Sequence, residues 1–290
     1  MADHRPVHAA EDTSAGRAAT PEPDRPGSGV GGGTRFSDVL RAENRTTWET
    51  AVTHPFVTSL FAGTLPDRDL AAYLVQDYRF ADGFMALIGA AVATADNYPS
   101  RHRFARFIGE VAGDEDTYFR EAVEELSESS AESSAESWAE NSAGHSAGSA
   151  DGDGVPDTEA TTGFRQLFAD AAASGSYPAV IAVILVCEWL YLDWATRPEN
   201  RAYGTGPDGY PARPVHAEWV RLHDYPDFHE LVAFLRSEMD RVGDRTPEDA
   251  RSAREFFART VDLELQFFDG HADRDPGHGG HTRGTGRPPR

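Results

Sequence analysis

The chain has 290 residues, of which 48 are acidic and 27 are basic, so its formal net charge is −21. All the basic residues are arginine. Such an acidic excess argues against binding to nucleic acid, whose phosphate groups require a basic surface. A dense acidic surface stays hydrated in strong salt, where screening cancels the repulsion between like charges. The composition therefore indicates adaptation to a high-salt cytoplasm.

Cysteine content and hydropathy bear on the cellular compartment. Cys187 is the single cysteine, so no disulfide is expected within the chain. The N-terminal residues lack the apolar segment of a signal peptide. The longest apolar run, residues 179–187, is shorter than the roughly 20 residues that span a bilayer. We therefore expect a cytoplasmic protein that does not cross a membrane.

Three segments of low complexity are predicted to be disordered. Residues 1–34 and 272–290 are rich in Gly, Pro, Asp and Arg, and residues 127–162 repeat Ser, Ala and Glu before a run of Gly and Asp. Such segments cannot bury enough apolar surface to offset the entropy lost on ordering. We expect one folded domain over residues 35–271, interrupted by the acidic insertion at 127–162.

The rest of the chain has the apolar period of helices and almost no alternating strand pattern. We expect an all-α bundle of about eight helices, without βαβ units. One helix start is marked by Thr64 as the cap and Pro66 in the first turn. The expected helical segments are residues 36–53, 55–62, 64–95, 100–126, 164–173, 178–197, 213–223, 227–242 and 246–268.

Four carboxylates are expected to point into this bundle. The i, i+3, i+4, i+7 spacing places Asp77, Glu115 and Glu264 on the apolar stripes of their helices. Glu188 lies in a helix that is apolar nearly all round. A buried charge costs several kcal/mol unless it is paired or neutralised. Structural hydrogen bonding would explain any one of them, but four together favour the site of a small-molecule enzyme.

A metal centre is the first interpretation of these carboxylates. Carboxylate-bridged di-iron bundles use Glu-x-x-His pairs. The residue three positions after Glu115, Glu188 and Glu264 is Tyr, Tyr and Phe, respectively. No His therefore stands in a ligand position, and we expect neither a metal nor another cofactor.

Acid–base chemistry with a nucleophile is the second interpretation. Cys187 and Tyr191 are four residues apart and share a helix face, and Glu188 and Tyr191 are neighbours at a spacing of three. Cys187 and Glu188 lie about 100° apart around the helix, so both cannot point equally into one pocket. The sequence leaves open which of the two does so. A lone cysteine on an apolar helix is also a common packing residue.

Several short motifs together resemble the TenA / thiaminase II family. They are HPFV at 54–57, GTLP at 63–66, YLVQDY at 73–78, Tyr177-Pro178 followed by CEWLY at 187–191, Trp219, and ELQFF at 264–268. The resemblance covers about residues 36–271, apart from the insertion. In the closing motif the family glutamate is usually followed by Phe-Trp, from which ELQFF departs.

The resemblance implies a haem-oxygenase-like bundle that binds no haem and holds an aminopyrimidine. Members cleave thiamine, or hydrolyse an amino or formylamino group from its breakdown products. Carried over by position, Asp77 matches the aspartate that holds the pyrimidine, Glu264 the glutamate that moves protons, and Tyr191 a pocket tyrosine. Tyr78, Phe84 and Phe268 are further candidates for stacking on the substrate ring, although Phe84 also fits core packing.

The resemblance also leaves two branches of the family open. One branch has a nucleophilic Cys in Pro-Cys-x-Trp-x-Tyr, and here Cys187 is present but Val186 replaces the Pro. The other branch has Glu-x-x-Tyr after a Tyr-Pro, which Glu188 and Tyr191 fit. We favour the Glu-type branch, with Cys187 kept as the alternative catalytic residue.

The resemblance leaves other functions open and also implies an assembly state. A related branch that carries out an oxidative ring closure in quinone-cofactor synthesis would need basic side chains and His on the buried stripes, which are poor in both. A non-catalytic pyrimidine-binding or regulatory protein is a further alternative. Family members tend to form dimers or tetramers, so the resemblance implies a homo-oligomer.

Overall fold

The computed structural model describes residues 34–131 and 156–272. The predictions of disorder for the N-terminal segment, the tail and most of the insertion lie outside this part. The described residues form helices and no strand, which confirms the predicted all-α class. The helices are α1 Phe36–Glu43, α2 Arg45–Val52, α3 Pro55–Ala62, α4 Asp67–Thr94, α5 Tyr98–Glu110, α6 Asp116–Ala131, α8 Glu159–Ala173, α9 Tyr177–Thr196, α10 Pro198–Arg201, α11 Pro214–Arg221, α12 Pro226–Val242 and α13 Pro247–His271.

The helix predicted over residues 36–53 is two helices, α1 and α2. They are separated at Asn44, whose backbone leaves the helical region at φ −106° and ψ 17°. The Asn44 side chain donates from Nδ2 to the Leu40 carbonyl oxygen at 2.8 Å. This local bond competes with the helical backbone bonds, which is why Asn is a frequent helix terminator.

Thr64 does not cap α4, contrary to the prediction. The N-cap is Pro66, which makes no side-chain capping bond. The amide of Thr64 instead donates to the Ser59 carbonyl oxygen at 2.9 Å, and Gly63 is left-handed at φ 69°. These are the bonds of a helix C-terminus. Thr64 therefore ends α3, and α4 begins at Asp67.

The insertion is bordered by more helix than predicted. The segment expected at 100–126 contains α5, a π-helical turn at Val111–Glu115 and α6, which continues to Ala131. On the other side α8 begins at Glu159, five residues before the predicted helix. The Thr158 side chain caps α8 by accepting from the Thr161 amide at 3.1 Å. The low-complexity composition therefore overestimated the insertion at both ends.

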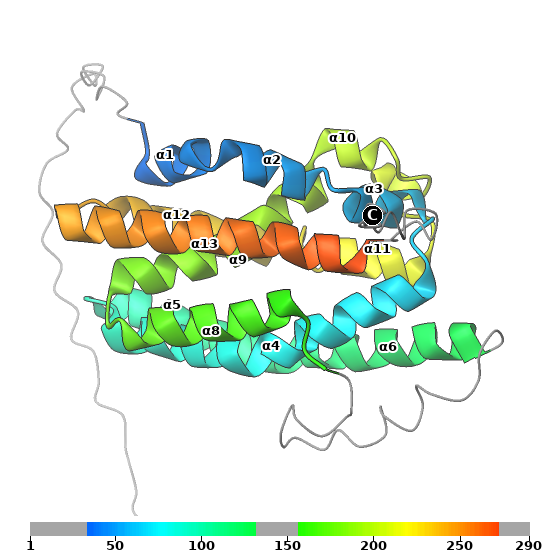
Figure 1. Cartoon of the computed structure of the whole chain (residues 1–290), viewed down its shortest axis with the longest axis horizontal. Coiled ribbons are helices and arrows are strands. Elements are labelled where there is room, and N and C mark those ends of the chain that lie inside the picture. The colour runs from blue at the N-terminus through cyan, green and yellow to red at the C-terminus, as the bar shows by residue number, and fades with distance from the viewer. Residues whose placement is uncertain (1–33, 132–155, 273–290) are drawn as a thin grey trace, which may run out of the picture. The chain divides into compact units, whose positions relative to one another are not determined.

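Two groups of helices meet at the centre of the bundle. α9 packs against α12 and α13, whereas α4 packs against α5, α6 and α8. α4 also contacts both α9 and α13, and Figure 1 shows α13 lying above α8 and α4. The junction of α4, α9 and α13 therefore lies deep in the bundle.

α9 is the core helix of the bundle. It is long and apolar enough to cross a membrane by length and composition, but 78% of its apolar window is buried inside the protein. Its low amphipathicity is explained by neighbours on every side, because α2, α4, α8, α12 and α13 all contact it.

Candidate active site

The junction of α4, α9 and α13 brings together side chains from three distant parts of the chain. Each helix contributes two residues that are four positions apart and therefore on one face. The pairs are Tyr73 and Asp77 from α4, Cys187 and Tyr191 from α9, and Glu264 and Phe268 from α13. We call these six residues the central cluster.

One half of the central cluster is aromatic. The hydroxyl oxygens of Tyr73 and Tyr191 lie 2.5 Å apart. The Phe268 ring is stacked on Tyr73 at 6.2 Å between centroids, with an angle of 3° between the planes. It also contacts Tyr191 at 6.1 Å. Trp219 of α11 contacts both tyrosine rings edge-on. These rings form an aromatic surface of the kind that holds a heteroaromatic ligand.

The other half of the central cluster is acidic. Burial raises the pKa of Glu264 well above its ordinary value, and the negative charge of Asp77 raises it further. A hydrogen bond with the Cys187 thiol acts in the opposite direction. Glu264 is 3% exposed. A carboxyl group in this environment holds its proton at a higher pH than one in water, which suits a general acid.

Between residues 177 and 191, Cys187 is the one residue that is only partly buried. The central helix therefore has an accessible spot beside Glu264. Burial raises the pKa of the Cys187 thiol, and the charges of Glu264 and Glu188 raise it further. The thiol is therefore protonated at neutral pH, and it becomes a nucleophile only if a neighbouring base removes its proton.

Glu188 is also buried, at 8% exposure. Its charge raises the pKa of the Cys187 thiol, so the two side chains lie near each other. The structure thus brings Cys187 into contact with Glu264 and leaves Glu188 beside it. The Glu-type branch stays a prediction. The side chain of Glu115 lies outside the described residues.

The predicted stacking residues fall into two groups. Tyr191 and Phe268 belong to the central cluster. The Phe84 ring instead contacts Phe107 and Phe168, at 6.1 and 5.6 Å. Phe84 is two turns beyond Asp77 on α4, so it packs between α4, α5 and α8, and the structure does not bring it to the cluster.

Tyr78 lies at the margin of the site. Its ring contacts Phe119 of α6 at 5.6 Å, and Phe119 in turn contacts Trp219 at 5.7 Å. Tyr78 follows Asp77 directly and so points about 100° away from it around α4.

Sequence reasoning missed two residues of the site. The motif YLVQDY contains Tyr73 but gave it no role, although its position four residues before Asp77 gives the two residues a common face. His223 had no sequence signal. Its ring lies 4.9 Å from that of Tyr191 and 4.5 Å from that of Trp219, and its Nδ1 lies 2.8 Å from the Trp219 carbonyl oxygen. Burial lowers the pKa of His223 to about 4, so its imidazole is neutral at neutral pH.

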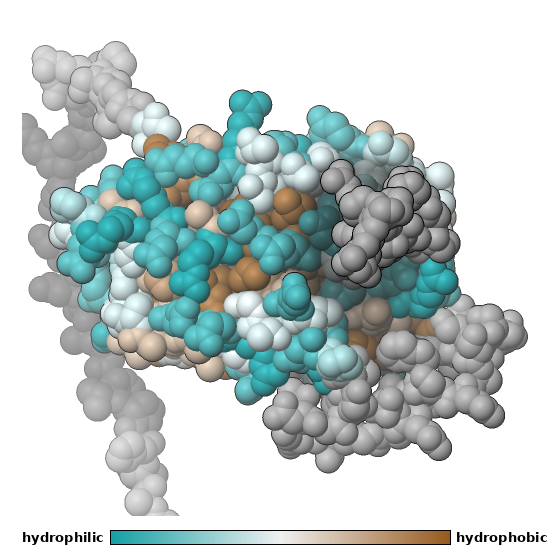
Figure 2. Space-filling view, in the orientation of Figure 1, coloured by the Kyte–Doolittle hydropathy of each residue, from teal (hydrophilic) through white to brown (hydrophobic). Residues whose placement is uncertain are grey.

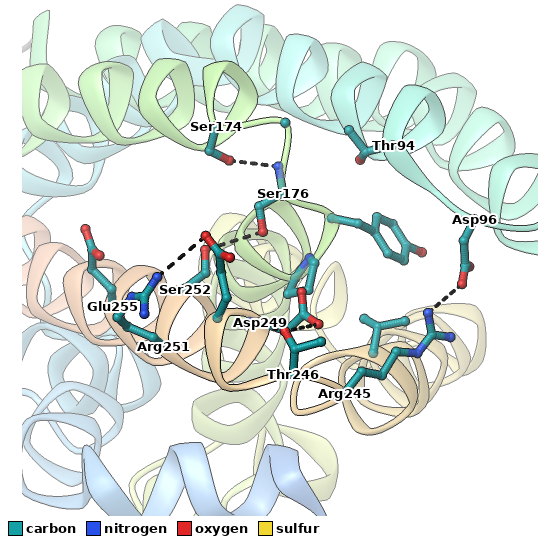
Figure 3. Close-up of a pocket in the computed structure, with 15 residues that line it drawn as sticks. Thr94, Asp96, Ser174, Ser176, Arg245, Thr246, Asp249, Arg251, Ser252 and Glu255 are labelled. Carbon is teal, nitrogen blue, oxygen red and sulfur yellow. Dashed lines mark hydrogen bonds and ion pairs between the residues drawn. The ribbon is translucent and has the colours of Figure 1, made fainter.

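A surface pocket of about 640 Å³ lies elsewhere, where α9 and α13 begin (Figure 3). None of the predicted site residues lines it. Its two arginines are paired with acids of the same pocket: Arg245 bonds to Asp96 at 2.8 Å, and Arg251 lies 3.6 Å from Glu248. The pocket therefore offers no unpaired arginine to an anionic ligand. In the described part of the chain, no group of three His, Cys, Asp or Glu side chains is placed to hold a metal ion.

Comparison with known proteins agrees with the motifs. The pattern of the TENA/THI-4/PQQC family matches residues 41–143. Over this stretch the chain is similar to the TENA/THI-4/PQQC family. It is 21% identical over 235 residues to a protein of Halalkalibacterium halodurans named aminopyrimidine aminohydrolase, covering 81% of this chain and 94% of that one. A protein of Bacillus subtilis with the same name is 23% identical over 237 residues, which are 81% of this chain and 88% of that one.

Solved structures extend the family relationship to the fold. A TenA homologue from P. horikoshii is 19% identical with a TM-score of 0.64, over 82% of this chain and 98% of the other. A structure from a Silicibacter species, described as a TenA family transcription regulator, is 19% identical with a TM-score of 0.63, over 82% and 96%. The resemblance to the TENA/THI-4/PQQC family and the helical fold predicted from the motifs are thus confirmed.

Proposed function

We propose that this protein is a hydrolase that breaks a carbon–nitrogen bond of an aminopyrimidine. The observation that carries the proposal is the central cluster, in which the carboxyl groups of Asp77 and Glu264 influence each other and the Cys187 thiol, next to the aromatic rings. The relatives named aminopyrimidine aminohydrolase support the same activity.

Asp77 is the residue that we assign to substrate binding. An aminopyrimidine presents an exocyclic amine beside a ring nitrogen. A carboxylate accepts a hydrogen bond from the amine and shares a proton with the ring nitrogen, which makes the ring a better electrophile. Phe268 and Tyr191 supply faces against which the flat ring can lie.

Glu264 is the residue that we assign to proton transfer. When the carbon–nitrogen bond breaks, the departing nitrogen takes up a proton, and a buried carboxyl group with a raised pKa holds one ready. The incoming nucleophile loses a proton in turn. In the Cys-type mechanism the sulfur of Cys187 attacks the carbon as the carbon–nitrogen bond breaks. Glu264 gives its proton to the departing nitrogen and takes up the proton of the thiol. Water later displaces the sulfur, which regains a proton. In the Glu-type mechanism Glu188 removes a proton from water, which attacks directly.

The test is an assay of the purified protein in strong KCl. The substrates are thiamine, the aminomethyl aminopyrimidine and its formyl derivative, and the variants are Cys187→Ala and Glu188→Gln. Loss of turnover in Glu188→Gln alone would support the Glu-type branch and make Cys187 a packing residue. Loss in Cys187→Ala alone would place the protein in the Cys-type branch.

A matched control uses Glu238→Gln. Glu238 is buried to the same degree as Glu188, at 7% and 8% exposed, but bonds to Tyr177, Ser100 and Arg241 away from the central cluster. Its variant should retain turnover when folded. If the wild type binds the pyrimidines without converting them, the protein is a binding or regulatory member instead of a hydrolase.

A further inference from the structure

The hydrogen bond between the hydroxyls of Tyr73 and Tyr191 uses only one of their two hydroxyl hydrogens. Each hydroxyl carries one hydrogen and can accept a bond. The single bond between them, at 2.5 Å, uses one hydrogen. In the described part of the chain neither hydroxyl has another hydrogen-bonding partner. The second hydrogen is therefore without an acceptor in the protein.

The surroundings indicate which tyrosine holds this second hydrogen. Tyr73 is 0% exposed, and the rings of Phe56 and Phe267 lie against it at 4.7 and 4.9 Å. Tyr191 is 7% exposed and shares a helix face with Cys187, which is only partly buried. The arrangement that leaves the hydrogen on the accessible side is Tyr73 donating to Tyr191, with the Tyr191 hydroxyl donating outward.

We propose that Tyr73 is a positioning residue, which donates its hydroxyl hydrogen to Tyr191 and thereby directs the Tyr191 O–H to a hydrogen-bond acceptor on the ligand. The ligand class is a heteroaromatic ring with an unprotonated ring nitrogen. This inference rests on the proposed function. It assigns a hydrogen-bond donor in addition to the carboxylate of Asp77, which supplies an acceptor. Together, the donor and the acceptor distinguish a pyrimidine, which has both acceptor and donor atoms, from a ligand that has only donors.

The experiment compares Tyr73→Phe, Tyr191→Phe and the double variant with the wild type. Each substitution removes a hydroxyl and keeps the ring. Binding is measured by calorimetry with the aminomethyl aminopyrimidine and with analogues in which one or other ring nitrogen is replaced by C–H. We expect Tyr73→Phe to weaken pyrimidine binding about three- to tenfold, because an unsupported donor is less well oriented. For the analogue that lacks the contacted nitrogen, Tyr73→Phe should bind as the wild type does. In the Tyr191→Phe background, Tyr73→Phe should have no further effect on pyrimidine binding.

Tyr177→Phe is the matched control. Tyr177 is a buried tyrosine of α9, the helix that carries Tyr191. Its hydroxyl donates to Glu238 at 2.5 Å, outside the central cluster. Its variant should lower the melting temperature without changing the preference between pyrimidine and analogue. This separates a loss of stability from a loss of ligand discrimination.

The following results would overturn the inference. Tyr73→Phe could weaken the binding of the pyrimidine and of both analogues equally, which would indicate a purely structural role. The effect of Tyr73→Phe on binding could also add in full to that of Tyr191→Phe, which would indicate that the two residues act independently. If Tyr73→Phe does not fold, Tyr191→Phe alone decides, and an unchanged discrimination between the ligands counts against the inference. A wild type that binds no aminopyrimidine overturns the proposed function and this inference together, whereas a binding wild type with unaffected variants overturns this inference alone.

Discussion

At the scale of one residue, the buried acid Glu264 makes the stability of the fold depend on pH. Its pKa is raised by burial and by Asp77, so the folded protein favours the protonated form. Its contribution to stability is therefore complete below the ordinary pKa of 4.5 and is lost as the pH rises through the higher folded value.

Glu264→Gln should consequently change stability in a pH-dependent way. The amide mimics the protonated acid, so the variant should melt at a higher temperature than the wild type at pH 8, and the difference should shrink toward pH 4. Turnover at pH 7 should fall by roughly 10²–10⁴-fold, because a general acid is lost. Thermal melts at the two pH values and an activity assay check both. An equal difference in melting temperature at both pH values would contradict the assignment.

Asp77→Asn should separate binding from proton transfer. Loss of the carboxylate removes a charge-assisted hydrogen bond, which is expected to weaken aminopyrimidine binding about 10- to 100-fold. The same change removes a cause of the raised pKa of Glu264, so the pH–rate profile should shift to lower pH. Steady-state kinetics across pH give both readouts. A weaker binding constant with an unmoved profile would show that Asp77 does not act on Glu264.

At the scale of elements, Gln76 joins α8 to α4 next to the site. Its Nε2 donates to the Pro156 carbonyl oxygen at 3.0 Å, and its Oε1 accepts from the Thr158 amide and the Thr161 hydroxyl at 3.0 and 2.7 Å. Gln76 is 4% exposed. The start of α8 is thus tied to the helix that carries Asp77, at the position where the chain returns from the insertion.

Gln76→Ala should release this connection. Several buried polar groups lose their partner, so we expect a loss of about 2–4 kcal/mol in stability. Hydrogen exchange should become faster at the Thr158 and Thr161 amides before it does so in α9. Gln166→Ala is the control, because its side chain bonds to Asp170 on the exposed surface and its removal should cost less than about 0.5 kcal/mol.

At the scale of the whole molecule, histidines with lowered pKa values contribute to the response to acid. Burial lowers the pKa of His216 and of His223 to about 4, from an ordinary 6.5. The unfolded chain therefore binds more protons between these values, and stability present above pH 6.5 is lost as the pH falls toward 4.

We expect the free energy of unfolding to fall over this window with a slope approaching two protons from these residues. The double variant His216→Gln, His223→Gln should show a shallower slope. Denaturant titrations at pH 7, 5.5 and 4.5 provide the measurement, with the exposed His229→Gln as the control. An identical slope in the double variant would show that carboxylates alone cause the acid response.

The net charge of −21 acts on the molecule as a whole. Figure 2 shows a largely hydrophilic face, with hydrophobic residues visible between polar ones near its centre. Salt screens like charges, since the Debye length falls from about 10 Å at 0.1 M to about 3 Å at 1 M. We therefore expect the melting temperature to rise between 0.1 and 2 M KCl. Light scattering over the same series tests the predicted dimer or tetramer. A flat melting temperature would contradict adaptation to high salt.

The sequence by itself determined the class of fold and predicted the chemistry of the site. Apolar periodicity is a local property, so it predicted the helices and the inward carboxylates Asp77 and Glu264 before any packing was known. Ordered short motifs then identified the family. Local signals also misplaced some boundaries: Thr64 reads as a cap in isolation, but its amide completes the end of the preceding helix.

Only the tertiary structure decided which side chains meet. A helical period gives the angle of a residue around its own axis, but it does not give the axial register between helices. For that reason Phe84 was predicted to lie in the site and packs elsewhere, while Tyr73 and His223 were found only once α4, α9 and α11 were in place. The contact of Cys187 with Glu264 has the same origin, because it depends on how α9 and α13 are aligned along their axes.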